Sequence, residues 1–131
     1  MGDVMANHDW VKEFPAAITV MDTEGVILEM NDKSAVTFSS DGGRELIGKN
    51  SLACHPEPSR TKLQQLLQAP KANLYTIEKA GVKKLICQLP WHRDGKFSGI
   101  VELSIELPAE LNSIDDLRLT IDDFPSTRGV K

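Results

Sequence analysis

The stretch LICQLPWHRDGKFSGIVELSIEL, residues 85–107, carries the clearest structural signal in the sequence. Apolar side chains alternate with other side chains along both of its halves, which is typical of β-strands. Between the halves stands Arg93-Asp94-Gly95-Lys96, and Asp-Gly is a strongly preferred centre for a tight hairpin turn. The stretch therefore predicts two long antiparallel strands joined by a short turn.

The same alternation predicts which side chains share a face of this hairpin. One face of the first strand carries Leu85, Cys87, Leu89 and Trp91. On the second strand, one face carries Phe97, Gly99, Val101, Leu103, Ile105 and Leu107, and the other carries Ser98, Glu102, Ser104 and Glu106. Because apolar faces are normally buried, we expect the apolar series to line the interior of the domain.

Further strands are predicted upstream of this hairpin. Residues 73–79, NLYTIEK, turn at Ala80-Gly81 into the strand that begins the hairpin. Residues 18–30 alternate around a turn at Asp22–Gly25, with Asp first and Gly last as a type I turn prefers. Together these segments predict five strands, with tight turns between sequence neighbours except across the middle of the chain.

A helical region fills that middle. Residues 31–50 are polar and rich in glycine, which favours short helices and turns. A longer helix over about residues 56–68 is indicated by Leu63, Leu66 and Leu67, which share one helical face. The order of elements predicts an α+β domain: a five-stranded antiparallel sheet with short helices and one longer helix packed on one face.

The length of the chain, 131 residues, is near the commonest size of one domain. We expect an N-terminal helical cap at residues 1–13, the domain itself at 14–107, and a C-terminal tail at 108–131 that is either helical or disordered. Trp10, Val11 and Phe14 cluster in a segment that is too short to be a stable helix alone. We therefore expect this segment to bury its aromatic rings in a homodimer.

Composition excludes several classes of partner. The net charge is −4 and the basic residues are scattered, which argues against nucleic acid. No apolar run approaches the ~20 residues that span a membrane, and no secretory signal opens the chain, so we expect a cytoplasmic protein without a membrane partner. In a reducing cytosol, Cys54 and Cys87 are expected to be buried, reduced thiols rather than a disulfide or metal site.

Patterns typical of catalysis do not occur. DGGREL, residues 41–46, lacks the Gly-Lys-Ser ending of a phosphate-binding P-loop. The pairs Asp115-Asp116 and Asp122-Asp123 stand in the polar tail, where solvated charge explains them. We expect that the protein is not an enzyme.

The ordered set of segments resembles the PAS family of sensory domains. Residues 18–38, ITVMDTEGVILEMNDKSAVTF, resemble the family's opening hairpin and the Asn that starts its next short helix, here Asn31. GRELIGKN at 43–50, HPEPSRTKLQQLL at 55–67 and WHRDGKFSGIVELSIEL at 91–107 are similar to its connecting loop, long helix and last hairpin. The resemblance implies a sensor or interaction module whose sheet and helices enclose a small cavity.

We predict that this cavity lies between the inner face of the sheet and the helices, and that it holds a modest, largely apolar ligand. Such ligands are usually held by an apolar lining with a few polar groups. The predicted lining residues are Ile18, Val20, Phe38, Leu46, Ile47, Leu63, Leu67, Leu89, Val101 and Leu103.

The adjacent pair Cys54-His55 admits two interpretations. Pro56 and Pro58 suit the first turn of a helix, and Glu57 complements the positive end of the helix dipole. We therefore interpret His55 as lying at or beside the N-cap of the longer helix. The alternative is that His55 is a haem ligand, with Cys54 as an alternative thiolate.

The resemblance also bears on flavin. The light-sensing branch of the family places a Cys directly after Gly-x-Asn, whereas Gly48-Lys49-Asn50 is followed here by Ser51. This excludes blue-light adduct chemistry and leaves non-covalent flavin open.

Three functions follow from these observations. The first is a PAS-type sensory module that binds a small ligand, mediates protein association in signal transduction, or does both, with an unidentified signalling partner. The second is a ligand-free dimerisation or docking module that uses Trp10, Val11, Phe14 and the outer face of the sheet. The third is a haem-binding redox or gas sensor.

Overall fold

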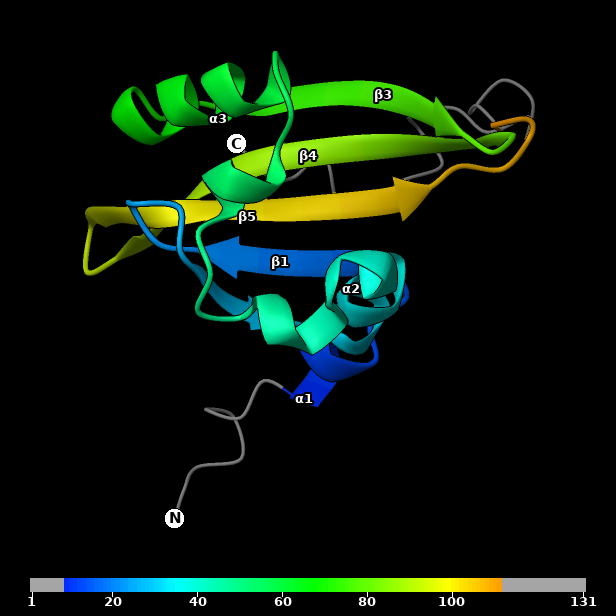
Figure 1. The fold of residues 1–131 in the computed structure, drawn as a ribbon, viewed down its shortest axis with the longest axis horizontal. Coiled ribbons are helices and arrows are strands. Elements are labelled where there is room, and N and C mark those ends of the chain that lie inside the picture. The colour runs from blue at the N-terminus through cyan, green and yellow to red at the C-terminus, as the bar shows by residue number, and fades with distance from the viewer. Residues whose placement is uncertain (1–8, 112–131) are drawn as a thin grey trace, which may run out of the picture.

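A computed structural model describes residues 9–111, and its elements follow the predicted order (Figure 1). The strands are β1 (Ala17–Met21), β2 (Ile27–Met30), β3 (Asn73–Lys79), β4 (Val82–Arg93) and β5 (Lys96–Glu106). The α-helices are α1 (Asp9–Lys12), α2 (Asp32–Thr37) and α3 (Ser59–Gln68). The 3₁₀ turns are η2 (Ser39–Asp41), η3 (Gly43–Leu46) and η4 (Ser51–Cys54).

The five strands form one antiparallel sheet in the order β2-β1-β5-β4-β3. The first and last strands pair at its centre, with Thr19 of β1 opposite Glu102 of β5. The predicted α+β architecture with a five-stranded antiparallel sheet is therefore confirmed.

Both predicted turns between β3, β4 and β5 are present. Ala80 and Asp94 have φ angles of 53° and 51°, and the glycines after them, Gly81 and Gly95, have φ angles of 80° and 79°. Two successive residues with positive φ give the turn whose twist matches that of the flanking strands. The Asp-Gly and Ala-Gly pairs thus join long neighbouring strands directly.

The helices α2 and α3 and the turns η3 and η4 all pack on the same face of the sheet, which we call the helix-covered face (Figure 1). One buried cluster joins α3 to the centre of the sheet: Met21, Leu63, Leu66 and Ile100. A second buried cluster joins η3 to β2: Ile27, Met30 and Leu46. The hydroxyl groups of Thr19 and Ser34 hydrogen-bond at 2.5 Å, which ties α2 to β1.

The apolar series of β4 and β5 lies on the opposite face, which we call the outer face. Thr19 and Met21 point toward the helices, so their neighbours Ile18 and Val20 point away. The pairing of β1 with β5 places Val101 and Leu103 on the same outer side. The expectation that the apolar series lines the interior is therefore wrong; the helix-covered face of β4 and β5 instead carries Ile86, Gln88, Ile100, Glu102 and Ser104.

A bulge in β2 changes which of its own side chains face the helices. Val20 pairs with Glu29 and Met21 pairs with Ile27, so Leu28 has no partner across the strand pair. An extra residue of this kind shifts the alternation by one position. Consequently Ile27 and Met30 both point toward the helices, and Leu28 is 42% exposed.

A second bulge lies in β5. His92 pairs with Phe97 and Trp91 pairs with Gly99, which leaves Ser98 without a partner. Phe97 packs against the core cluster, whereas Val101 lies on the outer face. The prediction that Phe97 and Val101 share a face is therefore wrong.

The helix α3 begins at Ser59, with Pro58 as its N-cap residue, rather than near residue 56. Thr61 donates its backbone N–H at 3.2 Å and its hydroxyl at 2.7 Å to the carboxylate of Glu57, which therefore supplies the side-chain cap. His55 instead ends η4, where its Nδ1 lies 2.7 Å from the carbonyl oxygen of Ser51. The interpretation of His55 as an N-cap is wrong, because the imidazole is already engaged by the preceding turn.

The N-terminal helical cap is described only from residue 9, and the C-terminal tail beyond residue 111 lies outside the described residues. The rings of Trp10 and Phe14 meet edge to face at 5.9 Å and stay 66% and 41% exposed. Within residues 9–111, the helices are too short and too polar for any of them to cross a bilayer.

Candidate functional site

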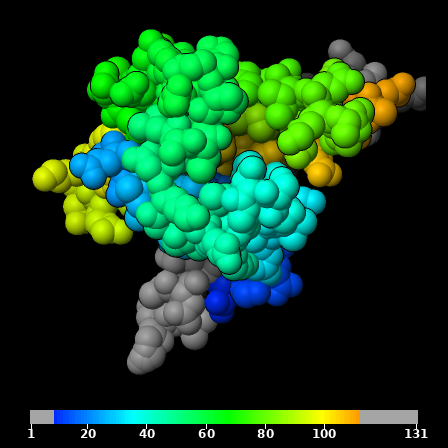
Figure 2. Space-filling view, in the orientation of Figure 1, coloured from blue at the N-terminus to red at the C-terminus, as the bar shows by residue number. Residues whose placement is uncertain are grey.

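The helix-covered face is hollowed between its two core clusters. Figure 2 shows residues of β4 and β5 at the bottom of a depression, with the cyan residues of α2 on one side and the green residues of β3 on the other. The space consists of an inner cavity of about 210 Å³ and an adjoining cleft of about 180 Å³. Phe38, His55 and Glu102 line both.

The inner cavity has a mainly apolar wall. Its apolar lining residues are Met21, Ile27, Met30, Phe38 and Leu46, from both core clusters. Its remaining lining residues are Thr19, Ser51, Cys54, His55 and Glu102. A wall of this composition, with a few polar groups, is typical of a small-molecule site.

The carboxylate of Glu102 is held by a chain of two side-chain amides. Gln88 donates from Nε2 to Oε2 of Glu102 at 2.8 Å, and Asn73 donates from Nδ2 to Oε1 of Gln88 at 2.8 Å. Gln88 is almost completely buried, with 3% of its surface exposed. This pair of hydrogen bonds therefore fixes one oxygen of Glu102, with the NH₂ group of Gln88 pointing toward it.

The imidazole of His55 is fixed in a similar way. Its Nδ1 lies against the carbonyl oxygen of Ser51, and because a carbonyl can only accept, Nδ1 carries the proton. In the neutral ring, Nε2 then has a free lone pair. His55 is half-buried, whereas the neighbouring Cys54 is exposed.

The adjoining cleft extends toward β3 and contains Tyr75. Burial raises the pKa of Tyr75 above its ordinary value of 10.0, and the negative charge of Glu102 raises this pKa further. Glu102 and Tyr75 line the same cleft, which is the geometric basis of this effect. Lys79 and Lys84 lie in the same cleft.

Of the ten predicted lining residues, two are found in the inner cavity: Phe38 and Leu46. Leu63 is fully buried in the core cluster, and Leu67 packs against that cluster. Ile47 is 41% exposed. The other five lie on the outer face of the sheet: Ile18, Val20, Leu89, Val101 and Leu103. The structure therefore does not bring the ten residues together around one cavity.

The sequence interpretation missed Glu102 because an alternating Glu on a strand was assigned to the solvent side. Gln88, in the apolar run of β4, was a usable signal, since a long amide in a central strand needs a hydrogen-bonding partner. Its partner follows from the β4–β5 register, in which Gln88 stands opposite Glu102.

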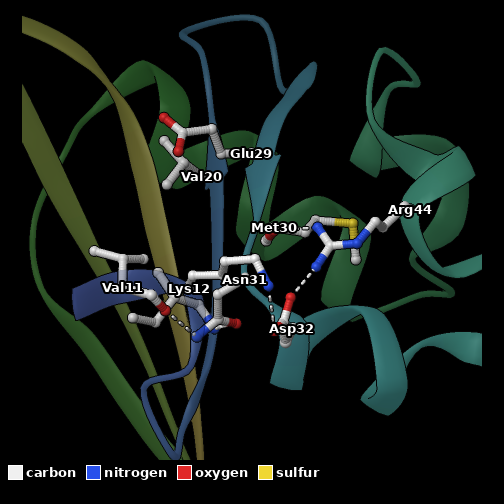
Figure 3. Close-up of a pocket in the computed structure, with 9 residues that line it drawn as sticks. Val11, Lys12, Val20, Glu29, Met30, Asn31, Asp32 and Arg44 are labelled. Atoms are coloured by element: carbon white, nitrogen blue, oxygen red, sulfur yellow. Dashed lines mark hydrogen bonds and ion pairs between the residues drawn. The ribbon is translucent and has the colours of Figure 1, made fainter. Parts of the chain in front are cut away.

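A larger hollow, of about 480 Å³, lies elsewhere, between α1 and the edge strand β2 (Figure 3). Most of its polar groups hold one another or the backbone: Asp32 pairs with both Lys12 and Arg44, and Arg44 donates to the carbonyl oxygen of Met30 at 2.9 Å. Asn31 donates to the carbonyl oxygen of Val11 at 3.0 Å, as the dashed lines in Figure 3 indicate. These contacts hold the N-terminal segment, so we assign this hollow a structural role.

Residues with metal-ligating side chains are not gathered in one place. Within residues 9–111, no three His, Cys, Asp or Glu side chains lie close enough together to hold a metal ion. Cys87 is buried as expected, but Cys54 is exposed, which corrects the prediction for that thiol. Cys87 lies on the outer face, away from Cys54 and His55.

Neither a protein-family model nor a curated protein matches the sequence. Solved structures do match. The PAS domain of BvgS from Bordetella pertussis is similar, with a TM-score of 0.56 and 18% identity over 88% of this chain and 91% of that one. The Aer2 receptor of Vibrio cholerae, described as a dual PAS-heme oxygen sensor, gives a TM-score of 0.53 and 16% identity over 71% of this chain and 95% of that one.

A further similar structure is VqmA bound to DPO, with a TM-score of 0.61 and 13% identity over 81% of this chain and 58% of that one. At sequence identities this low, the similarity shows a shared fold and does not identify a ligand. The strand order, the helices on one face and these similarities agree with the resemblance seen in the sequence, and the chain has the fold of PAS domains.

Proposed function

We propose that the protein is a sensory module of the PAS type that binds a small molecule in the inner cavity and acts in the cytoplasm through a signalling partner. The observation that carries this proposal is the cavity of about 210 Å³ between the two core clusters, with Glu102 and His55 in its wall. A well-packed domain of this size seldom keeps such a space without use.

A route for the signal is present in the hydrogen bonds around the cavity. Thr19 lines the cavity and is bonded to Ser34 of α2. Asn31 caps α2 and also holds the carbonyl oxygens of Val11 and Ala16. A ligand that displaces Thr19 or α2 would therefore act on the N-terminal segment.

The similar structures support a ligand without naming it. The Aer2 receptor is described as a dual PAS-heme oxygen sensor, and VqmA is described as bound to DPO. Haem fits poorly here, because about 210 Å³ lies below the ~300–1,000 Å³ of pockets for drug-sized ligands, and haem is larger than most of these. Flavin meets the same limit, so a haem or flavin sensor is the least favoured alternative.

Nuclear magnetic resonance of the ¹⁵N-labelled full chain tests ligand binding. We expect single-ring probes to shift the amide signals of Thr19, Phe38 and Leu46. Cys54→Phe should abolish the shifts, because this exposed side chain lies at the cavity wall and a phenyl ring would fill the space. Its control is Ala53→Phe, an exposed neighbour outside the lining. If no probe moves these signals, ligand binding in the cavity is rejected.

An absorbance spectrum of the purified protein addresses the cofactor alternatives directly. A Soret band would support the haem sensor, and a flavin spectrum would support non-covalent flavin binding. We expect a protein peak near ~280 nm from the two Trp residues and one Tyr, with neither cofactor band.

A second candidate function, docking to another copy of this chain, is favoured by the outer face of the sheet. Its apolar residues are Ile18, Val20, Leu85, Leu89, Val101, Leu103 and Ile105. We propose that this face, with Trp10 and Phe14, forms the interface of a homodimer. In a two-fold homodimer this one face would serve both copies, because such an interface uses the same surface of each.

Light scattering tests this dimer. Val101→Lys should reduce the mass to that of a monomer, because it places a charge in the middle of the apolar face. Ile47→Lys, at an exposed position away from the outer face, should leave the mass unchanged. Deleting residues 1–13 should also favour the monomer. A monomeric wild-type protein at every concentration would reject the dimer.

A further inference from the structure

We infer that the ligand of the inner cavity is a small organic cation: a single-ring or short-chain amine whose ammonium group is bound by Glu102. This inference rests on the proposed function and adds the chemical class of the ligand. It follows from the orientation of Glu102, from the absence of an ion-pair partner for it among the described residues, and from the shape and lining of the cavity.

The orientation of Glu102 is set by Gln88. An ionised carboxylate can only accept hydrogen bonds, so Gln88 must present its NH₂ group, and its own oxygen must accept from Asn73. The hydrogen bond from Gln88 uses Oε2 of Glu102. The carboxylate lines both the cavity and the cleft, so its Oε1 is the atom that remains for a ligand.

No basic side chain within residues 9–111 neutralises this carboxylate. The ion pairs of the described residues involve Asp32, Glu57 and Glu106, and none involves Glu102. Two lysines line the adjoining cleft, but their strand positions are distant from Glu102. Lys84 stands opposite Glu106, four residues along β5 from Glu102, or about 13 Å between Cα atoms. Lys79 stands opposite Val82, six residues along β4 from Gln88, the residue that pairs with Glu102. A half-buried carboxylate without a counter-charge is unfavourable, and a bound cation would supply that charge.

His55 adds a second acceptor on the wall of the cavity. With the proton on Nδ1, the neutral ring offers only a lone pair at Nε2. Neither His55 nor Glu102, when the carboxylate is ionised, then offers a spare donor to the cavity. Two acceptors suit an ammonium group, which has three donors, and disfavour a carboxylate or phosphate ligand.

The rest of the cavity fits the apolar part of such a ligand. An apolar cavity of about 150 Å³ is large enough for benzene, so about 210 Å³ accommodates one ring with a short substituent. The sulfur atoms of Met21 and Met30 and the ring of Phe38 are polarizable partners for a ring or for a cationic group. A small amine thus places its charge at Glu102 and its apolar part between the core clusters.

Three probes of nearly equal shape test this inference: benzylamine, which is a cation, benzyl alcohol, which is neutral, and benzoate, which is an anion. Each is titrated into the ¹⁵N-labelled full chain at pH 7.5, and the signals of Thr19, Phe38 and Leu46 report the dissociation constant. We expect benzylamine to bind more tightly than benzyl alcohol by a factor of about ten or more, which is the effect of one hydrogen bond to a charged group. Benzoate should bind least.

Glu102→Gln keeps the shape of the side chain and removes its charge. This variant should bind benzylamine only as tightly as it binds benzyl alcohol. Its affinity for benzyl alcohol should differ from that of the wild type by less than about twofold. Glu29→Gln is the matched control, since Glu29 is an exposed strand residue paired with Val20 on the outer face. This control should leave all affinities unchanged.

The outcomes separate the two proposals. If benzyl alcohol or benzoate binds the cavity as tightly as benzylamine, the cavity is a ligand site but the cationic class is wrong. The same conclusion follows if Glu102→Gln keeps the preference for benzylamine. If no probe shifts the cavity signals, the proposed function fails and the inference fails with it. The comparison of probes uses the wild-type protein, so it does not depend on the folding of the variant.

Discussion

Gly99 of β5 lies directly against the backbone of Met21 at the end of β1. A Cβ atom on Gly99 would lie 2.8 Å from the carbonyl carbon of Met21 and from Cα of Asp22, and Gly99 has a φ of 144°. The carbonyl oxygen of Met21 also accepts a hydrogen bond at 2.9 Å from the indole of Trp91, the residue paired with Gly99. Close approach at this point holds the central strand pair together.

Gly99→Ala should therefore be strongly destabilising, by about 3 kcal/mol or more, because it adds a clash with rigid backbone to an unfavourable φ. Gly48→Ala is the control, since Gly48 has a φ of 94° but nothing within 4 Å of the added atom. It should cost only about 1–2 kcal/mol. Urea denaturation of the two variants gives the comparison, and equal costs would show that the contact with Met21 is unimportant.

Asn31→Asp tests the connection between the N-terminal segment and the sheet. Asn31 accepts from the backbone of Ile18 at 2.9 Å and donates to the carbonyl oxygens of Val11 and Ala16 at 3.0 and 2.9 Å. The carboxylate keeps the acceptor but turns its other oxygen toward three carbonyl groups, those of Val11, Ala16 and, at 3.4 Å, Phe14. We expect a loss of about 2–3 kcal/mol in thermal or urea unfolding.

The control for this change is Asn50→Asp. Asn50 also accepts from a backbone N–H, that of Leu52, and donates to a carbonyl, that of Glu24, but it is exposed. Water can solvate the new carboxylate there, so we expect a cost below about 1 kcal/mol. Hydrogen exchange should show faster exchange near Val11 only in Asn31→Asp; protection equal to wild type would contradict the proposed connection.

Tyr75 gives a spectroscopic measure of Glu102, because it is the only tyrosine in the chain. Its phenol should titrate above pH 10.0 in the folded protein, as burial and the charge of Glu102 both raise its pKa. Glu102→Gln should lower this pKa but leave it above 10.0, since burial is the larger cause. The phenolate absorbance in the ultraviolet measures the shift, and Glu29→Gln should not change it.

The same shift affects stability at high pH. A tyrosine with a raised pKa in the folded state stabilises that state below its unfolded pKa, and this contribution is lost as pH rises through the folded pKa. A pKa of Tyr75 that Glu102→Gln leaves unchanged would show that Glu102 and the phenol do not interact.

Glu57 predicts a pH dependence at the acid end. Its hydrogen bond from the Thr61 side chain lowers its pKa below the ordinary value of 4.5, burial opposes this, and the Thr61 backbone and Arg60 reinforce it. The contribution is present above pH 4.5 and is lost as pH falls through the folded pKa. Glu57→Gln should therefore melt at a lower temperature than wild type at pH 7, and the difference should shrink toward pH 3. A constant difference would contradict the role of the charge.

The sequence by itself determined the local elements of this protein. Asp94-Gly95 and Ala80-Gly81 encode turns through positive φ angles, which depend on two adjacent residues and little else. Leu63 and Leu66 encode the buried face of α3 through helical spacing. Since tight turns join long neighbouring strands, the antiparallel sheet with helices on one face also followed from the order of segments.

Only the tertiary structure decided which face of the sheet the helices cover. Alternation shows that Leu89 and Val101 belong to apolar series, but it contains no information on the side from which α3 approaches. The bulges at Leu28 and Ser98 each shift the alternation by one residue within one strand, and the spacing of the apolar residues does not mark their positions. Glu102 faces the cavity because the helices cover its side of the sheet, where it stands between Thr19 of β1 and Gln88 of β4.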